Sequence, residues 1–187
     1  MKGYGFLTAV PLRAEPSDRA EMVNQLLPGD TLEVLRQEEK WSLVRLDYDG
    51  YEGWVDNKQY LPFDSAAALA ERGFLGTPYL WGGRSRSGID CSGLTQVCFK
   101  AMDVWLPRDA SQQFTCGVEV CPCDPRLDDL AFFQNDQGRI VHVGICLGDG
   151  RIVHASGYVR IDTLDRQGIF DGIAYTHRLH SIRRVVK

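Results

Sequence analysis

The stretch GIDCSGLTQVCFKAM, residues 88–102, decides the fold of the second half of the chain, because it predicts a helix that begins with a cysteine. Asp90 is a favoured N-cap residue, and apolar side chains follow it at helical spacing. These side chains are Leu94, Val97, Cys98, Ala101 and Met102. Cys91 then occupies the first helical position, on the inward side of the helix. Free N–H groups and the helix dipole favour a thiolate at this end, so we expect a lowered pKa for Cys91.

Two of the four histidines lie in neighbouring strand-like runs that a short loop joins. In the run IVHVGICLG, alternation of side chains puts His142 and Gly144 on the same face. A two-residue loop would turn His154 to the opposite face, whereas a three-residue loop, residues 148–150, would place it opposite Gly144 and diagonal to His142. Gly150 suits the left-handed residue that commonly ends a three-residue loop.

A cysteine nucleophile needs a base within hydrogen-bond reach and a third group that orients the base. Cys91, His142 and His154 fill these three roles if the three-residue loop forms. The combination favours a catalytic site over the alternative, in which each is a structural buried residue. His177 and His180 lie in a polar C-terminal stretch, and we interpret them as ordinary surface residues.

Composition narrows the class of protein. The chain has 187 residues, 44% hydrophobic content and a net charge of −4, which suits one or two small domains and disfavours nucleic acid or anionic membranes as partners. It contains no apolar run long enough for a membrane-spanning helix. The first residues make a poor signal peptide, so we expect a cytoplasmic protein, although a trimmed form of an exported protein would begin in the same way.

The cysteines predict neither a disulfide framework nor a metal centre. Six cysteines in a long chain that lacks an export signal are expected to be reduced. The sequence Cys121-Pro122-Cys123 is a weak metal motif, because zinc sites usually combine two spaced ligand pairs and only Cys116 precedes it. We therefore expect no metal.

The chain divides into two parts with different patterns. Residues 1–62 contain short strands separated by turns, which is typical of a small β-barrel. The strand-like stretches are FLTAVPLRAEP, DTLEVLRQ, WSLVRLDY and YEGWVDN. A helix that Asp64 or Ser65 caps and Gly73 ends opens the second domain, residues 63–187. The runs LAFFQ, RIVHVGICLG, RIVHASG, AYTHRL and SIRRVV follow the Cys91 helix and predict an antiparallel sheet, hence an α+β fold.

An ordered set of motifs in the second domain resembles the NlpC-type cysteine peptidases of bacterial cell-wall metabolism. The motifs are GTPYLWGG, DCSGLTQ, LPRDASQQ, LDDLAFF and HVGICLGDGRIVHAS, within residues 70–186. The resemblance implies a compact papain-like domain in which Cys91 is the nucleophile, His142 the general base and His154 the residue that orients the base. The family often has Gly-Asp-Leu where this chain has Asp128-Asp129-Leu130, a departure in a turn that leaves the chemistry intact.

The first domain, around YDGYEGWVDNKQYL, resembles a bacterial SH3-like barrel over residues 5–62. A barrel of this kind is typical of the family branch that cleaves the γ-D-glutamyl-diamino acid bond of free peptidoglycan peptides with an N-terminal L-alanine. That preference requires anions near the substrate ammonium, for which Asp90 and Glu21 are the candidates; a pure N-cap and a solvated turn residue are their alternative roles. Tyr79 resembles a tyrosine of the cleft, with a core aromatic as the alternative, and Ser92 offers a hydroxyl and a backbone N–H.

We therefore expect a monomeric cytoplasmic cysteine endopeptidase that acts on peptides recycled from peptidoglycan, without metal or cofactor. In this interpretation Cys91 attacks the γ-glutamyl carbonyl and His142 protonates the leaving amine. Two alternatives remain at this stage. One is a wall-peptide binding module without activity, and the other is a thiol amidase or acyltransferase on the same fold.

Overall fold

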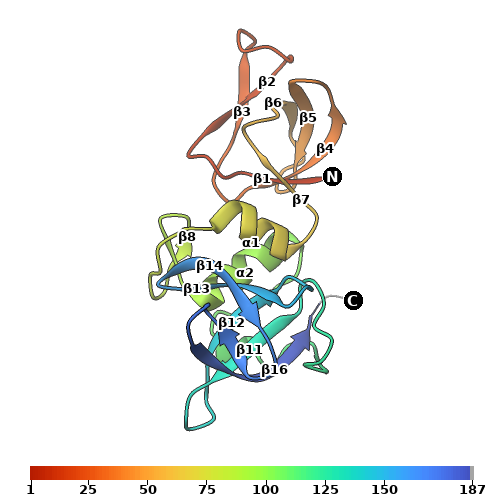
Figure 1. Cartoon of the computed structure of the whole chain (residues 1–187). Helices are drawn as coiled ribbons and strands as arrows, with labels where there is room; N and C mark the ends of the chain where they lie inside the picture. Colours follow the sequence, from red (N-terminus) through yellow and green to blue (C-terminus); the bar gives the residue numbers. More distant parts are fainter. Residues whose placement is uncertain (186–187) are drawn as a thin grey trace. The chain divides into compact units, whose positions relative to one another are not determined.

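The computed structural model describes residues 1–185 and divides the chain into two compact units, Met1–Asp64 and Ser65–Lys187 (Figure 1). The last strand of the first unit, β7 (Leu61–Phe63), extends past residue 62, where the sequence places the domain boundary. Residues 186–187, which include the end of the run SIRRVV, lie outside the described residues.

The first unit is a single antiparallel sheet of seven strands in the order β3-β2-β6-β5-β4-β1-β7. Besides β7 the strands are β1 (Lys2–Tyr4), β2 (Val10–Arg13), β3 (Met22–Leu26), β4 (Thr31–Gln37), β5 (Trp41–Leu46) and β6 (Glu52–Asp56). Alternate side chains, such as Val10 and Leu12, point to the same side and build one buried core. The expected strands are confirmed in β2, β4, β5 and β6, whereas the sequence does not predict β1, β3 and β7, in which burial does not alternate along the strand.

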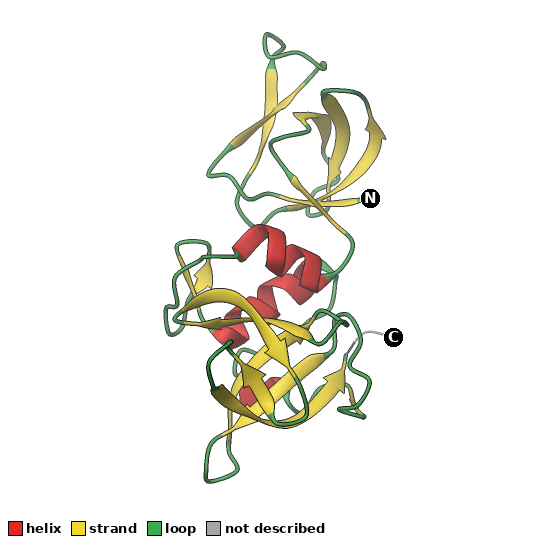
Figure 2. Ribbon diagram, viewed as in Figure 1, coloured by secondary structure: helices red, strands yellow, loops and turns green. Residues whose placement is uncertain are grey.

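Three helices belong to the second unit: α1 (Ala66–Phe74), α2 (Cys91–Ala101) and α3 (Ala110–Gln113). Ser65 caps α1, since its side chain accepts a hydrogen bond from the N–H of Ala68 at 3.0 Å. Gly73 lies inside the last turn, and the helix ends one residue later than the sequence predicts. The long helices α1 and α2 pack against each other and against the same sheet (Figure 2). Among the described residues, no helix is long and apolar enough to cross a membrane.

The second unit contains an antiparallel sheet in the order β10-β16-β11-β12-β13-β14-β15, and β15 pairs again with β16, so that six strands close into a ring. The strands are β10 (Val118–Val120), β11 (Leu130–Gln134), β12 (Ile140–Cys146), β13 (Arg151–Ser156), β14 (Tyr158–Leu164), β15 (Gly168–Phe170) and β16 (Tyr175–Arg184). A separate ribbon, β8 (Arg84–Ser85) with β9 (Gly88–Ile89), precedes α2. The single strand β16, residues 175–184, contains most of the run AYTHRL and the start of the run SIRRVV, which the sequence separates, and it closes the ring.

The two faces of this sheet have different environments. One face lies inside the ring, where apolar side chains from every strand of the ring form a core. Phe133 on β11 pairs with His142 on β12, so His142 shares this inner face. The neighbouring residue Val143 lies on the opposite face, and α2 packs against β12. The ring therefore holds the histidine while the helix on its outer face presents the cysteine.

Candidate active site

Cys91 occupies the first position of α2, as the sequence predicts, and only 8% of the residue is exposed. Burial raises the pKa of the Cys91 thiol, and the nearby charge of Asp90 raises it further. Backbone N–H groups of Val143 and Ser92 favour the thiolate but do not outweigh these effects. The expectation of a lowered pKa is therefore wrong, because desolvation exceeds the influence of the helix start. The resting sulfur holds its proton and needs a base during attack.

The hairpin of β12 and β13 has the three-residue loop that the catalytic interpretation requires. Cys146 pairs with Ile152, and the N–H of Leu147 donates to the carbonyl of Arg151 at 2.9 Å, which leaves residues 148–150 as the loop. Gly150 has a φ of 79°, the left-handed conformation expected there. The prediction that His142 and His154 share one face is confirmed, since their rings are hydrogen-bonded.

Gly144 makes room for this pair. A Cβ atom at position 144 would lie 2.9 Å from the Cβ of His154, closer than side chains tolerate. The absence of a side chain therefore lets the ring of His154 approach His142 across the hairpin. The sequence predicts this role for Gly144 from its place opposite His154.

A series of hydrogen bonds leads inward from His142. Its Nε2 lies 2.9 Å from Nδ1 of His154, and Nε2 of His154 lies 2.9 Å from Oδ2 of Asp162. A carboxylate only accepts hydrogen bonds, so Nε2 of His154 carries a proton. Burial lowers the pKa of His154, although Asp162 opposes this, so the ring is neutral. In a neutral ring with a proton on Nε2, Nδ1 is the acceptor. The proton between the rings therefore belongs to Nε2 of His142. This assignment leaves Nδ1 of His142 as a lone pair, the form that a general base requires.

Asp162 is a functional residue that sequence reasoning missed. It lies on β14, and its side chain is 6% exposed, with Oδ1 accepting a hydrogen bond from Nη2 of Arg160 at 2.8 Å. Arg160 pairs with His154 in the sheet, so Asp162 is a diagonal neighbour of His154 on the same face. The alternation in YVRIDTL is the signal that could have placed it, but the sequence does not predict β14 as a strand. We name His142, His154 and Asp162 the histidine series.

His142 itself is neutral in this setting. Burial holds the pKa of His142 well below 6.5, and the neighbouring rings of His177 and His154 lower it further. A neutral imidazole can take the thiol proton. The raised pKa of Cys91 and the lowered pKa of His142 therefore describe a neutral thiol beside a neutral imidazole at rest, rather than two ions.

His177 is not an ordinary surface residue, contrary to the sequence interpretation. It is half-buried, and its ring stacks on that of His142 with centroids 4.2 Å apart and planes at 27°. Burial and the nearby His154 lower the pKa of His177 to about 4. The continuous strand β16 brings it there, because closure of the ring places its start against β15. His180 is exposed, as expected, and its ring contacts Phe114.

The nitrogens of His142, His154 and His177 lie within 4.8 Å of one another, which raises the question of a metal ion. A bound ion lies in the plane of each ring that ligates it. His142 and His177 are stacked with a small angle between their planes, so their lone pairs do not converge on one point. The geometry favours a stacked ring that supports His142.

Cys91 lines a cavity of about 560 Å³. Tyr79, Asp90 and Ser92, which the sequence selects as substrate-binding residues, line the same cavity. A smaller cavity lined by His142 shares Tyr79 with it. Glu21 is exposed and belongs to the first unit, so its role near the substrate stays a prediction.

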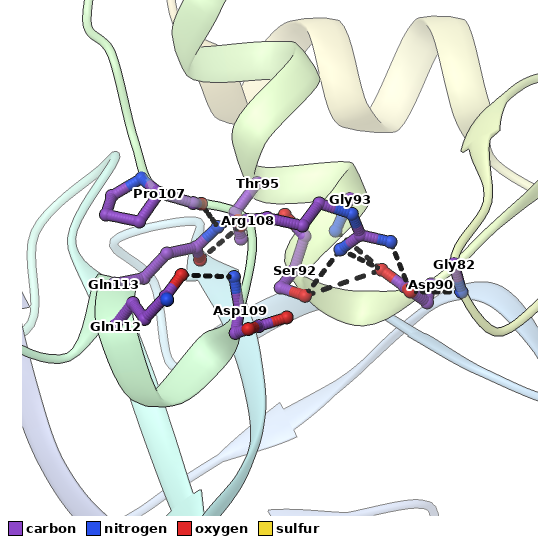
Figure 3. Close-up of polar contacts among 10 residues, drawn as sticks. All are labelled: Gly82, Asp90, Ser92, Gly93, Thr95, Pro107, Arg108, Asp109, Gln112 and Gln113. Carbon is purple, nitrogen blue, oxygen red and sulfur yellow. Dashed lines mark hydrogen bonds and ion pairs between the residues drawn. The ribbon is translucent and has the colours of Figure 1, made fainter.

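The carboxylate of Asp90 holds the start of α2 (Figure 3). Its Oδ1 accepts hydrogen bonds from the N–H of Gly93 at 2.7 Å and from Nη1 of Arg108 at 2.9 Å. Its Oδ2 accepts from the N–H of Gly82 at 2.7 Å and from Nη2 of Arg108 at 2.6 Å. Burial alone would raise the pKa of Asp90, but these donors hold it below its ordinary value. The role as N-cap is confirmed, whereas contact with a substrate ammonium stays a prediction.

Arg108 and Gln113, to which the sequence gives no role, fix the residues around Cys91 (Figure 3). Nη1 of Arg108 also donates to the hydroxyl of Ser92 at 2.9 Å, and Arg108 lines the cavity of Cys91. Gln113 is fully buried and donates to the carbonyl of Ser92 at 2.9 Å, while its Oε1 accepts from the hydroxyl of Thr95 at 2.7 Å. Both belong to the motif LPRDASQQ. The polar residues that follow its apolar residue are the sequence feature that could have identified them.

The cysteines differ from the expected reduced set at one place. Cys121 and Cys123 form a disulfide across Pro122, with Cα atoms 5.2 Å apart, a separation that suits such a bond. The remaining cysteines, Cys91, Cys98, Cys116 and Cys146, are free. The disulfide lies at the surface, away from the catalytic candidates in sequence, and gives CPC a covalent rather than a metal-binding role.

Comparison with known proteins agrees with this geometry. The NlpC/P60 family matches residues 76–178, and the bacterial dipeptidyl-peptidase Sh3 domain matches residues 12–59. A solved NlpC/P60 family protein from Bacillus cereus has a TM-score of 0.64 and 26% identity, covering 100% of this chain and 63% of that chain.

Two curated relatives are named gamma-D-glutamyl-L-lysine dipeptidyl-peptidase. The protein of Bacillus cereus is 37% identical over 125 residues, which cover 63% of this chain and 38% of the relative. The protein of Bacillus subtilis is 45% identical over 84 residues, which cover 44% of this chain and 28% of the relative. The matched part thus spans less than two fifths of either relative. Because the family match at residues 76–178 covers more than half of the sequence, the chain belongs to the NlpC/P60 family.

Proposed function

We propose that the chain is a cysteine endopeptidase that hydrolyses the γ-D-glutamyl-diamino acid bond of peptides derived from peptidoglycan. The observation that carries this proposal is the histidine series, which leaves Nδ1 of His142 as a proton acceptor while Cys91 lines the adjoining cavity. The backbone N–H of Val143, the residue after His142, contacts the sulfur of Cys91, so the two groups belong to one site.

The reaction follows from the protonation states of the two groups. Cys91 transfers its proton to Nδ1 of His142 as the sulfur attacks the γ-carbonyl carbon, and the N–H of Ser92 is a candidate donor to the oxyanion. Asp162, acting through His154, stabilises the imidazolium that forms. His142 then gives the proton to the leaving amine, and a thioester remains. Water attacks the thioester with His142 as base, which releases the γ-carboxylate and restores the thiol.

The names of the relatives support the choice of bond, and the cavity of Cys91 supports a small substrate. We include in the proposal a requirement for a free N-terminal L-alanine, for whose ammonium Asp90, in the lining of the Cys91 cavity, is a candidate anion, while the role of Glu21 stays a prediction. The proposal also places the reaction in the recycling of released peptides.

The alternatives are weaker on structural grounds. A binding module without activity does not need a buried carboxylate that fixes the tautomer of two successive histidines, and burying such groups is costly. A thiol amidase or acyltransferase would use the same histidine series on a different carbonyl, so product analysis must decide between these activities.

The test compares L-Ala-γ-D-Glu-L-Lys with its N-acetylated form. We expect mass spectrometry to show L-Ala-γ-D-Glu and L-lysine as products, and kcat/KM at least about a hundredfold lower for the acetylated peptide, because an ammonium left without its contacts loses binding energy. Cys91→Ala should abolish turnover, while Cys116→Ala, at another free cysteine, should not. Turnover in Cys91→Ala would end the proposal, and equal rates for the two peptides would remove the requirement for a free terminus.

A further inference from the structure

We propose that the diamino acid on the leaving side of the scissile bond binds in a second cavity beyond His142, where Arg166 and Arg178 hold its carboxylate and Asp136 holds its side-chain ammonium. The proposal rests on the proposed function, because the leaving residue is defined by the bond that is cut. It adds a binding site for the leaving half of the substrate.

The second cavity has a volume of about 790 Å³ and lies between three segments. These are the turn between β11 and β12, the turn between β14 and β15, and the start of β16. It shares Val141 and His177 with the small cavity lined by His142, which in turn shares Tyr79 and Val141 with the cavity of Cys91. The cavities therefore follow one another from the nucleophile, past the base, to the two arginines.

Proton transfer sets the direction of the substrate along this series. The acyl half must lie beside the sulfur of Cys91 and the N–H of Ser92, because these groups bond to its carbonyl. The leaving nitrogen must lie within reach of Nδ1 of His142, because that atom protonates it. The leaving residue thus points toward the cavities on the side of His142.

The charges in the second cavity match a diamino acid. Arg166 and Arg178 are exposed, and within residues 1–185 neither makes a hydrogen bond or an ion pair with another side chain. By contrast, Arg108, Arg160 and Arg184 in the same unit each pair with an aspartate. Asp136 is likewise exposed, and its carboxylate has no partner in this part of the chain. Two free guanidinium groups and one free carboxylate complement a ligand with a carboxylate and an ammonium.

The groups beside these side chains do not compete with them for the ligand. His177, which separates the second cavity from His142, has its pKa lowered to about 4 and so adds no positive charge. Asp165 beside Arg166 accepts a hydrogen bond from the hydroxyl of Tyr175. The cavity wall therefore offers the ligand the guanidinium groups and the carboxylate of Asp136.

The kinetic test uses L-Ala-γ-D-Glu-L-Lys and two analogues, one with a C-terminal amide and one with norleucine in place of lysine. For the wild-type enzyme we expect each analogue to lower kcat/KM about tenfold, the size of one charge-assisted contact. In the double variant Arg166→Ala/Arg178→Ala the penalty for the amide should vanish while the penalty for norleucine remains. Asp136→Asn should show the reverse pattern.

Arg139→Ala is the matched control, since Arg139 lies in the same turn between β11 and β12 but does not line the cavity. It should leave both penalties unchanged. If the arginine and aspartate variants keep both wild-type penalties while the peptides are still cut, the proposed site is wrong.

A binding experiment separates this proposal from the proposed function. NMR spectra of the Cys91→Ala protein with Nα-acetyl-L-lysine at millimolar concentration should show shifts of the guanidinium N–H signals of Arg166 and Arg178, and Nα-acetyl-L-norleucine amide should cause none. Absence of those shifts would overturn the second site even if the enzyme cleaves its peptide. Shifts without any cleavage by the wild-type enzyme would leave the site standing and overturn the proposed function.

Discussion

Two of the aspartate–arginine pairs in the second unit look alike and act differently. Asp90 pairs with Arg108 at the start of α2, and Asp162 pairs with Arg160 on β14, with the aspartate side chains 8% and 6% exposed. Asp90 accepts at both oxygens from guanidinium and backbone N–H groups, and the hydroxyl of Ser92 also donates to its Oδ1 at 3.4 Å; no imidazole is among its donors. Asp162 gives Oδ1 to its arginine but Oδ2 to a histidine.

This difference shows how one kind of ion pair performs two tasks. A carboxylate that bonds to no imidazole sets no histidine tautomer, so Asp90 fixes the turn and helix that present Cys91, and its contact with a substrate ammonium stays a prediction. A carboxylate that bonds to an imidazole decides which nitrogen carries the proton, so Asp162 sets the protonation of His154 and, through it, of His142. Substitution of the two aspartates should therefore affect different measurements.

The largest effect should come from the aspartate in the histidine series. Asp162→Asn can present its amide to Nε2 of His154 and favour the wrong tautomer, so we expect kcat to fall roughly a hundredfold with little change in KM. In His154→Gln the amide oxygen accepts from His142 without help from Asp162. Adding Asp162→Asn to that variant should therefore cost less than about threefold.

Wild type, Asp162→Asn, His154→Gln and the double variant must be compared at an equal fraction of folded protein, which thermal melts can establish. Independent losses, with Asp162→Asn equally harmful in both backgrounds, would mean that the aspartate does not act through His154. The role would then be structural, as at Asp90.

A smaller effect on turnover is expected at the other aspartate. Asp90→Asn keeps an N-cap side chain but removes the charge opposite Arg108, whose side chain is 30% exposed, so we expect the free energy of unfolding to fall by about 2 kcal/mol. The kcat of the folded variant should stay within about threefold of wild type, because the proton path is untouched. A large loss of kcat with unchanged stability would contradict the contrast between the two pairs.

The stability difference at Asp90 should depend on pH in one direction. The pKa of Asp90 is lowered below 3.8 in the folded state, although burial opposes this, so its carboxylate stabilises the fold fully at neutral pH. The advantage of wild type over Asp90→Asn should shrink as the pH falls below 3.8, and urea unfolding at several pH values measures it.

The sequence predicts those parts of the site that depend on residues close to one another along the chain. Capping identifies Asp90 and therefore the position of Cys91, and strand alternation with loop length brings His142 and His154 to one face. Asp162 lies on β14, which pairs with the preceding strand β13; the alternation in YVRIDTL could have placed it, but the sequence does not predict that strand. His177 depends on the pairing of β15 with β16 that closes the ring, which no local pattern contains. The lowered pKa that the sequence predicts for Cys91 is wrong for a related reason: the helix end is local, but the burial that outweighs it arises from the whole unit.

The central claim is that Asp162 and His154 hold His142 neutral, with its lone pair on Nδ1. Imidazole ¹⁵N NMR of histidine-labelled protein tests it most directly, with His142→Ala to assign the signals. Because burial and the neighbouring rings hold the pKa of His142 well below 6.5, the account predicts a protonated Nε2 and an unprotonated Nδ1 that persist as the pH falls through 6.5. Two protonated nitrogens on His142 at pH 7, or a proton on Nδ1 alone, would contradict it.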